Sequence, residues 1–482
     1  MSVEMQDIHL VYMMPEILVA VMAMALLLLS AWTHKGGAGV VHWLTVLTIV
    51  GVILVIHVGE GTGTTFGGQF VTDAMSRYMK VLMCLGMIIP VIMSRDYIRA
   101  HAMDGGEYHV VSMFAMLGGM ILASSGGFVI LYLGLELMSL SFYVLAAWRR
   151  DDVRSGEAGL KYFVLGSMAS GLLLYGISMI YGATGGATGF KEVAALLATP
   201  GIHDNQLLVL GMVMVLAGMG FKVAAAPFHM WAPDVYQGAP TPVTAFMAVM
   251  PKVAAFAALF RLVADVFAPA HGQWVGVLQL FAILSMATGA FAGLVQTDLK
   301  RLLAYSSIGH VGYILIGLVS NSAAGMQGVM VYLTIYLFMT VGVFAIIISF
   351  DRQGLGENIR DYQGLAHKQP LVAFVLAMFM FSMAGIPPLA GFIGKLNIFM
   401  AAVKAGLVPL AVLGVLFSAV SAFYYLRVVK VMYFDPADRE SRVTFSGGGF
   451  LVVTMSMVLI LMWGILPGDL LTWTASSVQT WH

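Results

Sequence analysis

The stretch GFKVAAAPFHMWAPDVYQGAP, residues 220–240, places a lysine and two prolines where an apolar segment should cross a membrane. Lys222 follows an apolar run that begins near Leu207, and Pro227 and Pro233 come after it. A charge at the centre of a bilayer costs about 2.5–3.5 kcal/mol on insertion scales, and such residues mark ion or proton pathways. A proline inside a helix leaves a carbonyl of the preceding turn without its N–H donor. The stretch therefore predicts a broken membrane helix that carries a functional lysine.

The composition indicates a membrane protein that binds no metal or redox cofactor of its own. Of the 482 residues, 60% are hydrophobic and 10% are charged, against about 25% charged in a soluble domain. The formal net charge is zero, so we expect no nucleic-acid partner. Cys84 is the sole cysteine, which excludes disulfides within the chain, iron–sulfur clusters and cysteine zinc sites. No His/Asp/Glu cluster has the spacing of metal ligands.

Apolar runs of the length needed to cross a bilayer recur along the whole sequence, which predicts an all-α polytopic membrane protein with about fourteen transmembrane (TM) helices. These runs fall at about 11–32, 40–58, 78–94, 108–125, 127–148, 158–182, 207–229, 242–267, 274–295, 301–319, 325–350, 370–403, 407–434 and 448–467. They leave no stretch large enough for a soluble domain.

Basic residues are distributed unevenly between the two sets of connections. They gather after the odd-numbered spans, as in the cluster Arg149, Arg150 and Arg154. The connections after even-numbered spans contain only Arg77, Lys80, Lys191, Arg261 and Lys404. By the positive-inside rule, the odd connections lie in the cytoplasm and both termini lie on the outer, periplasmic side.

A short motif occurs twice in corresponding positions. AGMGFK (217–222) and AGFIGK (390–395) share the pattern A-G-x-x-x-K and lie five spans apart, an odd offset that inverts the second copy relative to the first. The second copy belongs to MAGIPPLAGFIGKLNIF (383–399), which is also interrupted by prolines. Paired broken helices are the pattern of inverted-repeat transporters that have their site near the middle of the membrane.

Few ionisable residues lie well inside the apolar spans, and they are Glu136, Lys222, Lys252, Lys395, His229 and His310. Burial in an apolar environment lowers the pKa of a lysine in general, so buried lysines are candidates for proton carriers near neutral pH. In another interpretation, Glu136 and one lysine form a buried ion pair that only fixes helix register. That interpretation leaves two lysines without an acidic partner.

The prolines near these lysines predict interrupted helices and free backbone carbonyls. Pro227, Pro251, Pro387 and Pro388 would free the carbonyls of Val223, Met247, Met383 and Ala384, respectively. Such carbonyls are tolerated at membrane depth only where protein or water satisfies them. A plain proline kink is the alternative.

The sequence does not decide whether two histidines act as proton relays or only pack against their neighbours. His229 lies seven residues after Lys222, which is two turns on and on the same face if the helix continues. His310, in AYSSIGHVGY, lies near Ser306 and Ser307, which favours a polar stripe.

Three stretches, FKVAAAPFHMWAPDVYQGAPTPV, TDLKRLLAYSSIGHVGY and GIPPLAGFIGK, closely resemble the antiporter-like membrane subunits of respiratory complex I, the proton-pumping NADH:quinone oxidoreductase. The resemblance covers about residues 108–434. It implies fourteen helices with two inverted five-helix repeats, each with a broken helix (TM7 and TM12). The implied divisions are 1–107 (TM1–3), 108–267 (TM4–8), 268–434 (TM9–13) and 435–482 (TM14).

The resemblance also implies a function. The TM5 glutamate, TM7 lysine, TM8 lysine and TM12 lysine or glutamate of the family's proton path correspond to Glu136, Lys222, Lys252 and Lys395. We therefore expect a proton-translocating subunit without its own redox centre, driven by redox chemistry in other membrane-arm subunits. A bacterial inner membrane is favoured over a mitochondrial one. The alternatives are a subunit of a multisubunit cation (Na⁺)/proton antiporter, or a structural scaffold in the membrane arm.

Overall fold

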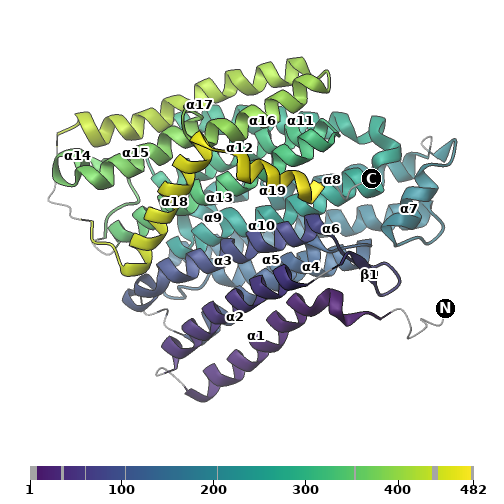
Figure 1. Ribbon diagram of the computed structural model, residues 1–482, viewed down its shortest axis with the longest axis horizontal. Coiled ribbons are helices and arrows are strands. Elements are labelled where there is room, and N and C mark those ends of the chain that lie inside the picture. Colours follow the sequence, from purple (N-terminus) through teal and green to yellow (C-terminus); the bar gives the residue numbers. More distant parts are fainter. Residues whose placement is uncertain are drawn as a thin grey trace.

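The computed structural model describes residues 8–33, 37–59, 61–101, 103, 105–202, 205–351, 354–436 and 443–478. These segments form a bundle of long helices (Figure 1). Within them, thirteen helical segments are long and apolar enough to cross a membrane. The helices of these segments are α1 (Met14–Thr33), α2 (Ala38–Val58), α3 (Ala74–Ala100), α4 (Gly106–Ala123), α5 (Phe128–Ala146), α6 (Val153–Ala183), α8 (Gln206–Val223), α10 (Thr241–Arg261), α11 (His271–Leu294), α12 (Leu299–Val319), α13 (Ala323–Asp351), α17 (Val408–Phe434) and α18 (Gly447–Ile465).

A further crossing consists of two half-length helices in series, α15 and α16, which gives the fourteen crossings that the sequence predicts. The shorter helices are α7 (Phe190–Leu197), α9 (Trp231–Gly238), α14 (Leu365–Lys368), α15 (Pro370–Ala384), α16 (Ala390–Lys404) and α19 (Gly468–Val478). The strands β1 (Gly63–Thr65) and β2 (Phe70–Thr72) form an antiparallel hairpin in the connection between α2 and α3.

The two predicted helix breaks are confirmed. α8 ends at Val223 because Ala224 adopts a left-handed conformation (φ +61°), and the chain resumes its helix only at α9. α15 ends at Ala384 in the same way, with Gly385 at φ +87°, and α16 follows. In both cases the left-handed residue donates its N–H to carbonyls of the last helical turn, which is a common way to end a helix.

The predicted break at Pro251 was wrong. α10 runs from Thr241 to Arg261 with this proline inside it. The proline removes one hydrogen bond, but the whole apolar window of α10 is buried inside the protein. The freed carbonyl therefore never faces lipid, which is the condition under which membrane helices tolerate proline.

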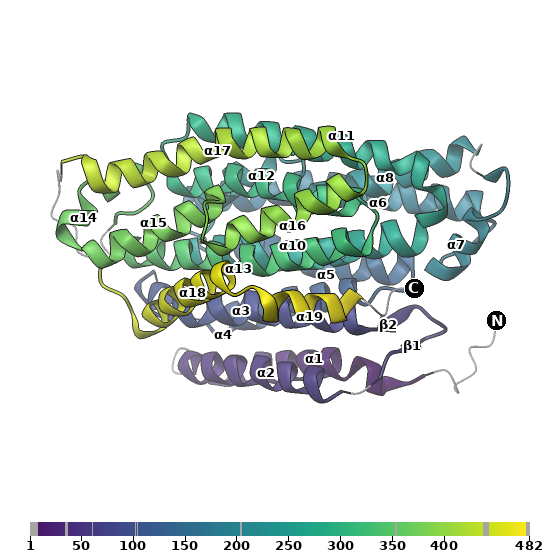
Figure 2. The same ribbon diagram turned by 45° about the horizontal axis from the view of Figure 1, so that its top comes forward.

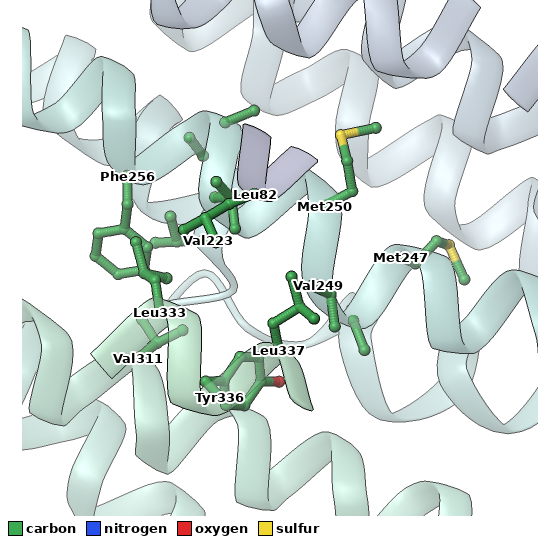
Figure 3. Packing of buried hydrophobic residues seen from close by; sticks show 14 of the residues in the cluster. Leu82, Val223, Met247, Val249, Met250, Phe256, Val311, Leu333, Tyr336 and Leu337 are labelled. Atoms are coloured by element: carbon green, nitrogen blue, oxygen red, sulfur yellow. The ribbon is translucent and has the colours of Figure 1, made fainter. Parts of the chain in front are cut away.

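Two helices form the centre of the bundle. The apolar windows of α10 and α13 are 100% buried, whereas those of α1, α6 and α17 are 28–33% buried. Figure 2 shows α1 and α2 as a layer on one side and α11 and α17 on the opposite side. Side chains from α3, α8, α10, α12 and α13 meet in the core between them (Figure 3). A helix that is apolar on every face is expected in this position.

Both described ends of the chain lie at the same end of the bundle, beside the β-hairpin (Figure 1). The N–H of His9 donates to Thr65 Oγ1 at 2.9 Å. At the other end of the sequence, Val478 lines the same cavity as Gly68 of the hairpin turn. That this end faces the periplasm stays a prediction.

Glycines allow the first two helices of each predicted repeat to pack closely. A Cβ added to Gly118 of α4 would lie 2.4 Å from Met138 N of α5. A Cβ added to Gly289 of α11 would lie 2.5 Å from Gly309 N of α12. The pairs α4–α5 and α11–α12 thus approach in a similar way, as a repeat requires, while the divisions at 107/108 and 267/268 stay predictions.

We expect Gly289→Ala to destabilise the bundle, because its methyl group would overlap the backbone of α12 and overpacking costs about 1–3 kcal/mol. Gly309→Ala is the matched control, since its Cβ would lie 3.7 Å from Gly289 Cα, which is an ordinary van der Waals contact. The measurement is the thermal unfolding midpoint of the purified protein in detergent. Equal midpoints for both variants would contradict the close approach at Gly289.

Candidate functional site

Lys222 lies in the last turn of α8 and is surrounded by hydroxyl groups. Its Nζ donates to Ser139 Oγ at 2.9 Å, and at 3.4 Å to both Tyr143 OH and Ser170 Oγ. These partners come from α5 and α6, which enclose the lysine so that 6% of it is exposed. A hydroxyl can accept from a charged ammonium or donate to a neutral amine. The surroundings therefore suit both protonation states.

Glu136 lies one turn before Ser139 on α5 but does not contact Lys222. The residue is half-buried, and its buried Oε1 has no hydrogen-bond partner within the described chain. Within the described chain, Glu136 therefore does not form the direct ion pair with a lysine that one interpretation of the sequence predicts. Glu136 instead lies on a face of α5 that is partly exposed, beside the exposed Leu133 and Leu140.

Lys252 lies at the centre of the molecule, in the middle of α10. Its side chain is 2% exposed, and its Nζ donates to Tyr336 OH of α13 at 3.3 Å. Tyr336 OH in turn donates to Ser307 Oγ of α12 at 3.0 Å. Figure 3 shows the Tyr336 hydroxyl among apolar side chains such as Leu337. The polar groups near Lys252 thus form a narrow line through an apolar core.

His310 continues this line, because both of its ring nitrogens have hydroxyl partners. Nδ1 is 2.7 Å from Tyr332 OH, and Nε2 is 3.2 Å from Tyr425 OH of α17. Tyr425 OH is also 2.5 Å from Ser306 Oγ. His310 lies within electrostatic range of the lysines on either side, on α10 and α16. The polar stripe that Ser306 and Ser307 predict is confirmed.

Lys395 of α16 binds the carbonyl end of the other half-helix. Its Nζ donates to Ala384 O at 2.8 Å and Met383 O at 3.1 Å, and to Ser418 Oγ of α17 at 2.8 Å. These are the two carbonyls that the prolines after α15 were predicted to free. The C-terminal end of a helix carries partial negative charge, so it stabilises a nearby cation.

The other break behaves differently. Lys222 bonds to side-chain hydroxyls, and none of its hydrogen bonds within the described chain goes to Val223 O, the carbonyl predicted to be freed by Pro227. Instead, Ala226 N donates to Ser285 Oγ of α11 at 2.8 Å, which attaches the break to the second half of the chain. The two breaks are therefore not equivalent.

The condition under which His229 would share a helical face with Lys222 is not met, because the helix ends at Val223. His229 lies in the segment between α8 and α9, half-buried, and its Nδ1 has no hydrogen-bond partner in the described chain. No continuous helix carries it toward Lys222, so a relay role stays a prediction without geometric support.

Sequence reasoning missed four buried charges, and one of them, Lys300, is 2% exposed and lies 3.6 Å from Glu357. Lys80 of α3 is 1% exposed and pairs with Glu16 of α1 at 2.7 Å. Arg261 is 2% exposed and contacts Asp73 at 3.0 Å and Asp265 at 3.5 Å. Lys80 and Arg261 stand next to polar stretches and were counted as connection residues. The carboxylate of Glu16 inside the first apolar run was the signal that could have revealed its partner.

The tyrosines around the lysines were also missed. Tyr143, Tyr332, Tyr336 and Tyr425 supply hydroxyls to the site from α5, α13 and α17. In the sequence they look like ordinary apolar residues of their spans. In the described part of the chain, no group of three or more His, Cys, Asp and Glu residues could hold a metal ion.

Known proteins share this chain's sequence and fold. Residues 125–421 match the family described as "NADH:quinone oxidoreductase/Mrp antiporter, TM". The chain is 52% identical over 484 residues to an NADH-quinone oxidoreductase subunit N of Magnetococcus marinus, with 100% of both chains covered. A chain of respiratory complex I from Thermus thermophilus with bound aureothin has a TM-score of 0.80 and 35% identity, and covers 96% of this chain and 99% of its own. A chain of the Mrp complex from Dietzia sp. has a TM-score of 0.83 at 20% identity, covers 97% of both chains and shows the fold alone.

We expect Tyr336→Phe to slow any proton transfer through Lys252, because it removes the hydroxyl between that lysine and Ser307 while keeping the ring. The loss of one hydrogen bond of about 1 kcal/mol corresponds to about a fivefold slower rate. Tyr362→Phe is the control, since Tyr362 OH bonds only to Gly356 O in the described structure. Proton flux through the purified complex in vesicles is the measurement, and equal flux in both variants would remove Tyr336 from the path.

Proposed function

Since the chain belongs to the NADH:quinone oxidoreductase/Mrp antiporter transmembrane family, we propose that protons cross the membrane along its buried lysines. The chain is a multi-pass, proton-translocating membrane-arm subunit of an NADH-quinone oxidoreductase of bacterial type. Its relatives carry the name subunit N, with 52% and 48% identity over nearly the full length. The observation that supports the proton path is the alternation of Lys222, Lys252, His310 and Lys395 with hydroxyl groups across the core.

We propose that each lysine alternates between ammonium and amine. As an ammonium, Lys222 donates to Ser139, and Lys395 donates to the carbonyls at the end of α15. Between Lys252 and Lys395, His310 can accept a proton on one ring nitrogen and release the other, because both nitrogens face hydroxyls. Among the described residues no hydrogen bond joins Lys222 to Lys252, so we propose transfer through water at this step.

The direction of transfer needs an external energy source. Moving one proton against 100 mV requires about 2.3 kcal/mol. We propose that the chain contains no redox centre and that the energy comes from redox chemistry in partner subunits. Electrostatic coupling can transmit it, because a change of a few ångströms between two charges at an effective dielectric of 20 alters their interaction by about 2 kcal/mol.

Glu136 is the residue through which a partner can act. It lies on a face of α5 where Leu133 and Leu140 are 55% and 52% exposed, so this face meets either lipid or another subunit. A carboxylate facing hydrocarbon without a partner is costly. We therefore propose that a neighbouring membrane-arm subunit covers this face. We also propose that the charge of Glu136 sets the electrostatic potential at Lys222.

The alternative of a sodium/proton antiporter subunit has less support. Its solved relative in the Mrp complex is 20% identical, which concerns the fold alone. Sodium sites in membrane transporters use carbonyl and carboxylate oxygens, whereas in the described chain the groups around the three lysines are mainly hydroxyls.

We expect Lys222→Ala to lower NADH-driven proton pumping about tenfold or more, since positioned proton-transfer groups contribute at least that much. Glu136→Gln should give a smaller loss, because it changes only the potential at Lys222. Both are measured with the assembled complex in vesicles. Lys430→Ala is the control, since this side chain is 61% exposed. Full pumping in both test variants with normal assembly would sink the assignment.

Lys222→Arg separates a proton carrier from a structural cation. Arginine keeps the positive charge but does not release its proton in proteins. A scaffold role predicts normal pumping in this variant, whereas a carrier role predicts that pumping is lost although the complex assembles. Assembly is measured by the yield of intact complex on native gels.

A further inference from the structure

The basic residues at the end of the bundle that carries the β-hairpin fall into two groups. Lys80 pairs with Glu16, and Arg261 contacts two aspartates, one of which, Asp265, is also within electrostatic range of Lys191. Arg77 and Lys404, by contrast, form no ion pair or hydrogen bond through their side chains within the described chain. Each of these two unpaired cations lines a mainly apolar cavity.

The cavity beside Arg77 has a volume of about 390 Å³ and lies between the start of α1, the end of α2 and the start of α3. Its wall includes Val11, Leu54 and Val58, which are 73%, 58% and 72% exposed. Such side chains meet lipid or another subunit in a membrane protein. The cavity thus opens to the outside of the chain, in the layer of α1 and α2 that lies at one side of the bundle (Figure 2).

Charge determines what can occupy this cavity. Lys80 also lines it, but Glu16 at 2.7 Å already neutralises that ammonium. Among the described residues that line the cavity, Arg77 therefore leaves a net charge of about +1 at neutral pH. A guanidinium next to hydrocarbon needs an anion, and its fork of donors matches the oxygens of a phosphate. The occupant must combine an anionic head with an apolar body.

We propose that this cavity binds an anionic phospholipid, with an acyl chain against Leu54 and Val58 and the phosphate on Arg77. A zwitterionic phospholipid fits less well, because its ammonium group would be repelled by the unpaired guanidinium. The cavity beside Lys404, of about 480 Å³, has a related lining. Lys404, however, is exposed at the end of α16, where water can solvate it, whereas the half-buried Arg77 depends on an anion.

The assembled complex, purified in mild detergent and exchanged into vesicles of phosphatidylglycerol and phosphatidylethanolamine, tests this site. The bound lipids are counted by mass spectrometry after stepwise delipidation. We expect Arg77→Gln to lower retained phosphatidylglycerol at this site about tenfold, as befits the loss of a charge-assisted bond. Leu54→Trp, which keeps the charge but fills the cavity, should lower it as well. Arg360→Gln, an exposed arginine outside both cavities, is the control and should change nothing.

Three results would overturn the proposal. Unchanged phosphatidylglycerol in both test variants would show that the cavity holds no lipid. An equal loss of both lipids in Arg77→Gln would show that the net charge of the lipid does not matter. Loss of a neighbouring subunit with unchanged lipid counts would assign Arg77 to a protein contact. None of these readings depends on which residues carry protons.

Discussion

A cation inside a membrane protein must be surrounded by oxygen atoms, and the rest of this structure depends on that constraint. The three lysines meet it in three ways. Lys222 is held by hydroxyls of α5 and α6, Lys252 by the phenol of Tyr336, and Lys395 by two backbone carbonyls and a serine. None of these partners carries a charge, so each lysine can lose its proton without leaving an anion unpaired in the core. An ion pair would hold the proton more firmly.

The broken helices follow from the same constraint. Intact helices consume their own carbonyls, so a lysine in an intact bundle finds few acceptors. The end of α15 exposes the carbonyls that bind Lys395, while the end of α8 places Lys222 where hydroxyls of two other helices converge. Ser285 then joins the first break to α11. A shift of α11 would therefore move the segment that follows Lys222 at the end of α8. This contact is a physical route for coupling between the two halves of the chain.

Charges away from the central line have another role. The pair Glu16–Lys80 and the contacts of Arg261 with Asp73 are neutralised locally. They hold α1 to α3 and the C-terminal end of α10 to the start of α3. Arg77 has no ion pair within the described part of the chain and lines a mainly apolar cavity, so we proposed a partner outside the chain. The same rule, that a buried charge requires a counter-group, thus separates residues that stabilise the fold from residues that bind a partner.

The sequence by itself determined the fourteen crossings, the two breaks and the lysines of the site, because apolar length, proline and buried charge are local properties. It also predicted the two carbonyls that Lys395 binds, since a proline acts on a carbonyl of its own chain a few residues earlier. Only the tertiary structure decided the distance of Glu136 from Lys222, the continuity of α10 through Pro251 and the position of His229. It also revealed the tyrosines, whose hydroxyls contact Lys222, Lys252 and His310 only because helices far apart in the sequence pack together. These features depend on packing between segments far apart in the chain, which no local pattern records.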